Sequence, residues 1–387
     1  MKVDNPLRAL MLERIRARGP MTFATFMDLA LYHPDLGYYA RAAQRSGRAG
    51  DFFTSVDVGP EFGELLARQF AEMWDVSGRP AVFDLVEAGA GNGRLSRDVL
   101  DAAWRDHPDF HAAVRVHLVE TSAAARAAHA ATLNDHPGKL ARSGPDLPDT
   151  VHGVVFANEL LDALPCHAIV MTCDGLRELV VDTEGDALIE REAPLSTPAI
   201  AEYLADVEAD LAPGWRAEVN LRAKAWVQQA ARRLSRGFLM IVDYGHEARE
   251  LFSATHAAGT RTCFRRHVAG HSDGANLERA PWLDEPGLGD ITAHVDLTTL
   301  SRTAIAEGLT PLGRLDQTYF LLGLGLADMV ESASTGRTAP SVPLKRRLAL
   351  KTLMLPGGLG STLKVLIFAK HLGTPALRGC SYSTRLT

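Results

Sequence analysis

A glycine-rich turn follows an apolar run near residue 85. The run ends at Val86 and continues as Glu87-Ala88-Gly89-Ala90-Gly91-Asn92-Gly93, and a helical pattern begins at Leu95. This order predicts a strand, a tight turn and a helix. Glycines let such a turn bring backbone N–H groups close to a ligand, and the N-terminus of the following helix favours negative charge. The spacing is Gly-x-Gly-x-Gly and not the Gly-x-Gly-x-x-Gly of a dinucleotide site, which favours S-adenosylmethionine over NAD.

Acidic residues end two further apolar runs. Glu120 follows the run at 116–119, and Asp243 ends the run at 237–243. In a Rossmann-like sheet the ligand lies beyond the carboxyl ends of the strands, where Glu120 could accept hydrogen bonds from two ribose hydroxyls. Each feature also has a structural alternative. A glycine turn is as often a simple strand–helix connection, and Glu120 could cap a helix that starts at Ser122.

The segment Asn158-Glu159-Leu160-Leu161-Asp162 contains the candidate catalytic residues. Transfer of a methyl group from a sulfonium mainly requires that the nucleophile be positioned. Carboxylates can hold a guanidinium nucleophile through paired, charge-assisted hydrogen bonds. Glu159 and Asp162, three apart at the start of an expected helix, would share one face. The alternative is that Asn158 caps this helix and the acids occupy its first turn, and the sequence alone leaves both interpretations open.

Histidine and cysteine spacing predicts no metal site. The histidines form no His-x-x-His or Glu-x-x-His pair of metal-binding type. The four cysteines contain no Cys-x-x-Cys pair, which fits a reduced intracellular protein better than a disulfide scaffold.

Composition excludes several classes of partner. The net charge of −6 provides no general attraction to nucleic acid or to anionic membranes. No apolar run reaches the roughly 20 residues of a membrane span. The N-terminus has arginines but also Asp4 and Glu13, which favours an amphipathic helix through Leu7, Leu10, Met11 and Ile15 over a transit peptide. We therefore expect no nucleic-acid partner, no membrane insertion and a cytoplasmic location.

The pattern of elements predicts an α/β fold. Residues 1–80 are expected to form a helical N-terminal region that packs on a core domain at 81–370, and residues 371–387 a flexible tail. Alternating strand and helix patterns in the core indicate a mostly parallel sheet. Insertions are expected at about 166–215, 246–290 and 320–360, the first with a β-hairpin around Asp174-Gly175 and the second as a long loop. The expected strands are 82–88, 114–119, 153–157, 237–243, 310–316 and 363–369, and the expected helices include 122–132 and 222–235.

Seven motifs, in order along nearly the whole chain, resemble the MidA-like S-adenosylmethionine-dependent methyltransferases, whose mitochondrial members are complex I assembly factors. The motifs are Phe26-Met27-Asp28 with His33-Pro34-Asp35-Leu36-Gly37-Tyr38-Tyr39, Gly50-Asp51-Phe52-Phe53-Thr54-Ser55 with Phe62-Gly63-Glu64-Leu65, the turn Glu87–Gly93, Asn158–Pro165, Asp243-Tyr244-Gly245-His246, Asp290–Asp296 and Leu363-Lys364-Val365-Leu366.

The resemblance implies a class I methyltransferase core with a seven-stranded sheet, and methylation of an arginine in a complex I subunit. It implies that Glu87, Gly89, Gly91 and Gly93 bind S-adenosylmethionine, and we add Glu120 to this set. It also implies that the Asn158-Glu159 segment and the Gly50–Ser55 loop line the reaction centre, and we count Thr54 and Ser55 among the cofactor-binding residues. In a eukaryote the location would be the mitochondrial matrix, and a homodimer is left open. Two departures are Ala90, where the family usually has proline, and a longer stretch from Gly274 to Glu285.

Overall fold

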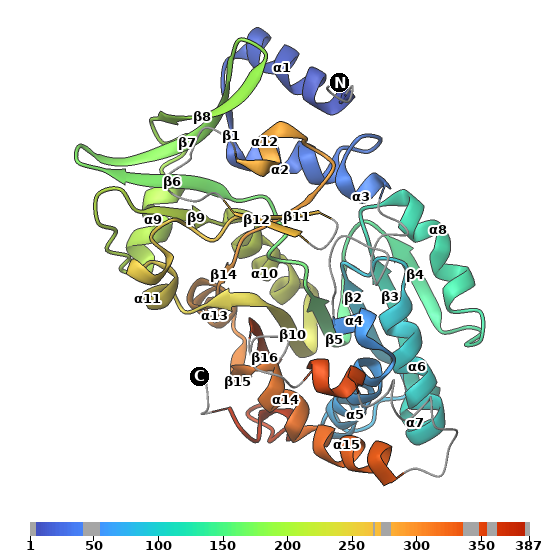
Figure 1. Ribbon diagram of the computed structural model, residues 1–387. Coiled ribbons are helices and arrows are strands. Elements are labelled where there is room, and N and C mark those ends of the chain that lie inside the picture. The colour runs from blue at the N-terminus through green and yellow to red at the C-terminus, as the bar shows by residue number, and fades with distance from the viewer. Residues whose placement is uncertain are drawn as a thin grey trace. The chain divides into compact units, whose positions relative to one another are not determined.

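The computed structural model describes residues 5–41, 55–265, 268–271, 280–335, 348–353 and 362–383. The chain divides into two compact units, each made of segments distant in sequence. Unit 1 comprises Met1–Phe52, Leu161–Trp226 and Gly245–Arg302, and unit 2 comprises Phe53–Leu160, Val227–Tyr244 and Thr303–Thr387. Figure 1 traces the helices and strands of both units.

Unit 2 contains a large, mostly parallel sheet. Its strands follow the order β15-β16-β10-β5-β2-β3-β4, and every adjacent pair is parallel except the two pairs that β16 makes. Because β2 lies between β3 and β5, the strand order reverses at β2, which is where ligands bind in open α/β sheets. The strands are β2 (Phe83–Ala88), β3 (Val114–Val119), β4 (Leu140–Gly144), β5 (Val151–Asn158), β10 (Leu234–His246), β15 (Thr310–Asp316) and β16 (Leu363–Lys370).

This architecture confirms the predicted α/β class and six predicted strands, although β5 and β10 are longer than expected. The structure adds β4, which the sequence analysis missed. Exposed residues alternate along β4 with partly buried ones, so its five residues lack the apolar run that identified the central strands.

Helices cover this sheet and complete its core. The amphipathic helix α5 (Glu61–Val76) buries Phe62, Leu66 and Phe70, and the Phe70 ring meets the Phe156 ring of β5 edge-on at 5.5 Å. The predicted helices at 122–132 and 222–235 correspond to α8 and α10. Besides α5, the helices with most of their residues in unit 2 are α4 (Ser55–Val58), α6 (Arg94–Asp106), α7 (Pro108–Ala113), α8 (Ala123–Thr132), α10 (Leu221–Arg233), α14 (Gln317–Gly323) and α15 (Leu326–Thr335).

The expected C-terminal tail is anchored over its described residues. Leu377 is buried, and the backbone N–H groups of Arg378 and Gly379 donate to Glu72 and Gln69 of α5. A short 3-10 helix, η3 (Arg378–Cys380), follows.

Unit 1 contains two smaller sheets and the N-terminal helices. One sheet has the order β1-β7-β6-β9 with β8 paired to β7, and the other has the order β12-β11-β13. The β6–β7 pair, which turns between Thr172 and Gly175, confirms the predicted hairpin. The first sheet consists of β1 (Met21–Thr22), β6 (His167–Thr172), β7 (Gly175–Glu184), β8 (Ala187–Ala193) and β9 (Arg216–Val219), and the second of β11 (Thr262–Arg265), β12 (Val268–His271) and β13 (Asp290–Thr292).

Two expectations about unit 1 need correction. The segment 246–290 is not one long loop, because it carries α11 (Ala248–Leu251), η1 (Ala254–His256), β11, β12 and α12 (Pro281–Asp284). Elements of three or four residues are too short to produce a periodic signal. The predicted first helix exists as α1 (Pro6–Arg18), but it buries Leu12 and leaves Leu10 37% exposed. The remaining helices with most of their residues in unit 1 are α2 (Phe23–Tyr32), α3 (Tyr38–Arg41), α9 (Ala199–Asp206) and α13 (Leu297–Ala306).

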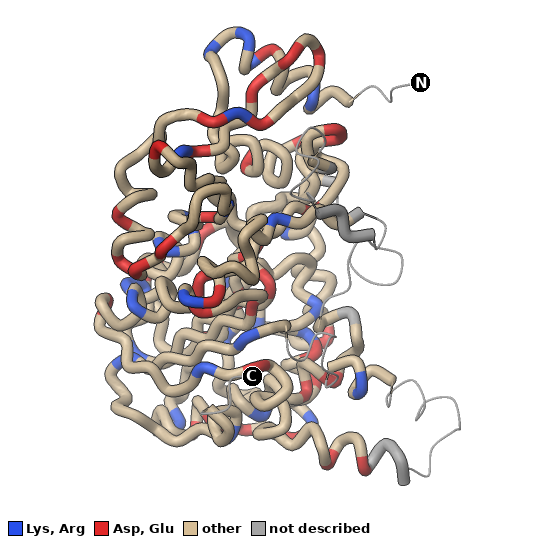
Figure 2. Tube along the Cα trace, turned by 60° about the vertical axis from the view of Figure 1, so that its left-hand side comes forward, with Lys and Arg blue, Asp and Glu red and all other residues tan. Residues whose placement is uncertain are grey.

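Acidic and basic residues are interspersed along the described chain (Figure 2). Within the described ranges, no helix has the length and apolar character needed to cross a membrane.

A buried carboxylate joins three strands of the large sheet near their amino ends. Asp84 of β2, 2% exposed, accepts hydrogen bonds from Arg115 and His117 of β3 and from the backbone N–H of His152 on β5. Burial alone would raise the pKa of Asp84, but the hydrogen bonds from His117, His152 and Arg115 lower it to about 2. The ionised form is therefore the one that stabilises the fold.

We expect Asp84→Asn to lower the free energy of unfolding by about 2 kcal/mol at pH 7, because a lowered pKa stabilises the folded state wherever the carboxylate is ionised. The deficit should shrink as the pH falls from about 4 towards 2, since protonation then removes the same stabilisation from the wild type. Urea titrations at pH 7 and pH 3 measure both effects. The matched control is Asp149→Asn, whose side chain is 95% exposed. Equal stability of Asp84→Asn and wild type at pH 7 would show that the Asp84 carboxylate does not stabilise the fold.

Candidate active site

The glycine turn after β2 is folded onto the end of β3. Gly89, Gly91 and Gly93 have φ values of 71°, 52° and 82°, in the left-handed region that favours glycine. The N–H groups of Gly89 and Ala90 both donate to the Val119 carbonyl, at 2.9 and 3.1 Å. The turn is therefore held by its neighbour strand, and its conformation depends on the glycines that the sequence singles out.

Glu87 connects β2 to the start of α6. Glu87 is only 5% exposed. Its carboxylate accepts hydrogen bonds from both the backbone N–H and the hydroxyl of Ser96. Burial raises the pKa of Glu87 to about 7, although the Ser96 hydrogen bonds act in the opposite direction. The residue at the N-cap position of α6, Gly93, offers no side chain, so Glu87 supplies the acceptor at this helix start.

Glu120 bridges the glycine turn and the start of α8. Its Oε2 accepts from Gly91 N at 2.9 Å, and its Oε1 accepts from Ser122 N at 2.8 Å. Ser122 is the N-cap residue of α8. The alternative that Glu120 caps this helix therefore accounts for its contact with Ser122 N but not for its contact with Gly91 N. The side chain is only partly buried. Its Oε1 also accepts from Thr121 Oγ1 at 3.4 Å, and its Oε2 has a second lone pair that can accept from a ligand hydroxyl.

His129 completes this arrangement and was not identified from the sequence. The side chain is buried, its Nε2 lies 2.8 Å from the Gly91 carbonyl oxygen, and its Nδ1 lies 2.8 Å from Ser143 Oγ. A histidine in the middle of the alanine-rich helix α8 gives no local signal, because its partners come from two other elements.

Residues 159–165 form a turn and not the expected helix. Glu159 has a φ of 51°, which is outside the helical region, and Pro165 disfavours helical geometry at the residue before it. Asn158 therefore caps no helix, and the argument that Glu159 and Asp162 share a helical face is wrong. A non-glycine residue with this φ is strained, and such residues cluster at functional sites.

The side chains of Asn158 and Glu159 meet at the carboxyl end of β5. Asn158 Nδ2 donates to Glu159 Oε1 at 3.1 Å, and Ser55 N donates to the same oxygen at 3.1 Å. The buried Oδ1 of Asn158 has no hydrogen-bond partner among the residues that the structure describes. Ser55 also pairs through its hydroxyl with Gln317 at 3.3 Å. Thr54 and the rest of the Gly50–Thr54 loop lie outside the described residues.

Contacts bring the Asn158 segment next to the glycine turn. Leu160 N donates to Asp243 Oδ2 of β10 at 3.1 Å, which fixes the chain directly after Glu159. A methyl group built on Gly89 would lie 3.0 Å from Leu160 Cδ1. In contrast, no described atom lies within 4 Å of a Cβ built on Gly91, so the described residues leave space open beside the turn.

Asp162, the third predicted catalytic residue, belongs to unit 1. Asp162 is buried, and its backbone carbonyl accepts a hydrogen bond from Ala293 N at 3.0 Å. The structure therefore gathers Ser55, Glu87, the three glycines, Glu120, Asn158 and Glu159 within unit 2, while Asp162 is placed by different neighbours.

Known proteins resemble this chain over most of its length. A family model described as "Putative S-adenosyl-L-methionine-dependent methyltransferase" matches residues 65–315. The mouse mitochondrial protein arginine methyltransferase NDUFAF7 is 31% identical over 348 residues, which cover 83% of this chain and 74% of the relative. The human protein of the same name is 29% identical over 95% of this chain and 85% of its own length.

A solved structure has the same fold. It is a "likely methyl transferase" from Burkholderia thailandensis with bound S-adenosyl-homocysteine, 29% identical, with a TM-score of 0.85 over 98% of both chains. Because the family model spans well over half of the sequence, this chain belongs to the S-adenosyl-L-methionine-dependent methyltransferase family that the model describes.

Proposed function

We propose that this methyltransferase acts on a guanidinium nitrogen of an arginine side chain in a protein substrate. The observation that carries the proposal is the pairing of Asn158 and Glu159 at the end of β5, where the amide oxygen Oδ1 is buried and has no hydrogen-bond partner among the described residues. A guanidinium presents only donors, so it requires acceptors such as an amide oxygen and a carboxylate.

The residues around the glycine turn fit S-adenosylmethionine. Open space lies beside Gly91, and the partly buried carboxylate of Glu120 is held next to it by Gly91 N and Ser122 N. We assign Glu120 to the ribose hydroxyls, and Gly89, Gly91 and Gly93 to the turn that the nucleoside approaches. Glu87 supports this turn through Ser96. When bound, the cofactor supplies an electrophilic methyl group.

Glu159 and Asn158 orient the acceptor nitrogen. Ser55 N and Asn158 Nδ2 hold Glu159 Oε1 in place, so the carboxylate meets the guanidinium without first reorganising. Methylation of a guanidinium nitrogen releases one proton, and we assign the Glu159 carboxylate as its first acceptor. Asp162 stays in the proposed set as a second acidic residue of the same motif.

The relatives support a protein substrate and a location for this proposal. The curated relatives are named protein arginine methyltransferases and mitochondrial, and the family resemblance implies a respiratory complex I subunit as the target. We propose the same substrate class here, in the mitochondrial matrix of a eukaryotic cell or in the cytoplasm of a bacterial one.

Incubation with methyl-labelled S-adenosylmethionine and lysate from cells that lack the enzyme tests the acceptor class. We expect label in one protein band and, after acid hydrolysis, in methylated arginine. Label in small molecules would instead indicate a small-molecule methyltransferase, and absence of label would indicate a binding protein that retains the fold.

Gly91→Val should abolish binding of S-adenosylmethionine, because the added side chain fills the space beside the turn. Gly138→Val is the matched control, since Gly138 also has a positive φ, of 77°, and no described atom within 4 Å of its built Cβ. Gly138 precedes β4, so it lies at the amino ends of the parallel strands, whereas the glycine turn lies at their carboxyl ends. Calorimetry measures both affinities, and equal affinity for wild type and Gly91→Val would contradict this site.

Glu159→Gln should lower turnover by roughly 100-fold while the affinity for S-adenosylmethionine is unchanged, because the amide cannot accept the released proton. The labelled lysate assay measures transfer and calorimetry measures the affinity. Glu184→Gln, the same change at an exposed position, should leave both unaltered. Normal transfer by Glu159→Gln would assign this carboxylate to holding Ser55 and Asn158 only.

A further inference from the structure

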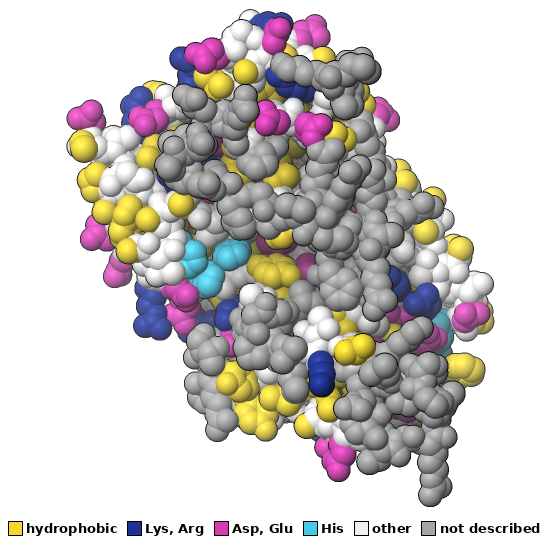
Figure 3. Space-filling view, in the orientation of Figure 1, with side chains coloured by type: hydrophobic (Ala, Val, Ile, Leu, Met, Phe, Trp, Pro, Cys, Tyr) yellow, Lys and Arg dark blue, Asp and Glu magenta, His cyan; other side chains and the backbone are white. Residues whose placement is uncertain are grey.

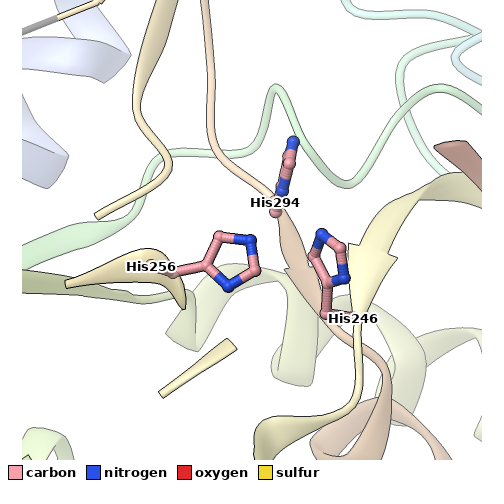
Figure 4. A group of neighbouring side chains, drawn as sticks. All are labelled: His246, His256 and His294. Atoms are coloured by element: carbon pink, nitrogen blue, oxygen red, sulfur yellow. The ribbon is translucent and has the colours of Figure 1, made fainter. Parts of the chain in front are cut away.

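Three histidines from separate segments of unit 1 lie together. His246 ends β10, His256 ends η1, and His294 lies between β13 and β14 (Val295–Asp296). Their ring centroids are 4.5 Å apart for His246 and His256, 5.0 Å for His246 and His294, and 6.2 Å for His256 and His294. Figure 4 shows the three rings side by side, and one potential ligand atom from each lies within 4.8 Å of the others.

Glu250 of α11 orients two of these rings. Its carboxylate Oε1 lies 3.0 Å from His246 Nδ1, and its backbone carbonyl oxygen lies 2.9 Å from His256 Nδ1. Histidines that bind metals commonly donate one ring N–H to a carboxylate or a carbonyl, which places the lone pair on the other nitrogen. With both Nδ1 atoms facing Glu250, Nε2 is the ring nitrogen of His246 and of His256 that such an arrangement would turn toward a metal.

The backbone at the third histidine is also fixed. His294 N donates to Thr260 Oγ1 at 3.0 Å, and Thr260 Oγ1 in turn donates to the buried Glu218. Just after His294, β14 pairs in parallel with the end of β10, in the register His246 to Asp296. The end of β10, which carries His246, and β14, which directly follows His294, are therefore held side by side by backbone pairing.

From this geometry we propose that His246, His256 and His294 bind a transition-metal ion, with Zn²⁺ the best match. Imidazole nitrogens suit zinc and its first-row neighbours and not Mg²⁺ or Ca²⁺, and three protein ligands leave the fourth tetrahedral position for water. Nitrogen atoms on a tetrahedral zinc lie about 3.4 Å apart, given Zn–N bonds of about 2.0–2.1 Å. Small rotations of the partly exposed rings bring the ligand atoms to that spacing.

The site is accessible and has a structural consequence. All three histidines are partly exposed, and Figure 3 shows a patch of histidine side chains on the face it displays. A bound ion links the end of β10 to η1 and to β14, and so ties down both flanks of the 246–290 segment. The spacing of the three histidines along the chain matches no local metal motif, so only the tertiary structure reveals the group.

Zinc titration of the full-length protein, after treatment with a chelator, tests the proposal by calorimetry. We expect the wild type to bind zinc, and His256→Ala and His294→Ala each to lower the zinc affinity by more than about 100-fold. This loss exceeds the one expected for a residue that only orients a ligand. Glu250→Gln should weaken the site by about 10- to 100-fold, since it removes the carboxylate that orients His246. His152→Ala, an exposed histidine of unit 2, should bind zinc as the wild type does.

Urea unfolding with and without zinc provides the second readout, because a ligand that binds the folded state stabilises it. The wild type and His152→Ala should gain stability, and His256→Ala should gain none. Circular dichroism establishes that each variant is folded before it is compared. Absence of zinc binding by the wild type, or equal affinity in His256→Ala, His294→Ala and the wild type, would overturn the site.

Discussion

Parallel pairing of β2 with both β3 and β5 is the constraint on which the candidate active site depends. It brings the glycine turn, Glu120 and the Asn158-Glu159 segment to one edge of the sheet, since each directly follows one of these strands. The pairing is close: a Cβ built on Gly153 of β5 would lie 2.1 Å from the backbone oxygen of Asp84. A register shift of one residue would turn every side chain of a strand to the other face, so the Asp84 network that joins all three strands also secures the site.

Carboxylates hold the backbone at this edge. Glu87 accepts from Ser96, Glu120 from Gly91 and Ser122, Glu159 from Ser55, and Asp243 from Leu160. Each of these acceptors satisfies an N–H group at a strand end or a helix start, where the regular hydrogen-bond pattern stops. Positioning in a methyl transfer depends on groups that do not move when substrate arrives, and this chain fixes them with the same acids that the sequence suggests for ligand binding.

Much of unit 2 could be predicted because its signals are local. Buried stretches such as β2 and the middle of β10 appear as apolar runs. The glycines of the turn mark the positions that need a positive φ. The polar edge strand β4 and the turn at 159–165 could not be predicted in this way. The turn is imposed by contacts from other elements, such as the hydrogen bond from Glu159 N to the Val242 carbonyl oxygen of β10, and a local acid pattern there resembles a capped helix.

The sequence by itself determined the α/β class, the central strands, the glycine turn and the family, because each of these can be recognised from short patterns of contiguous residues. Only the tertiary structure decided that Glu159 adopts a left-handed backbone, that His129 supports Gly91, and that Asp162 belongs to a different unit from Glu159. It alone also gathered His246, His256 and His294. The physical reason is that such contacts join residues far apart along the chain, and their energies depend on distances that no local spacing specifies.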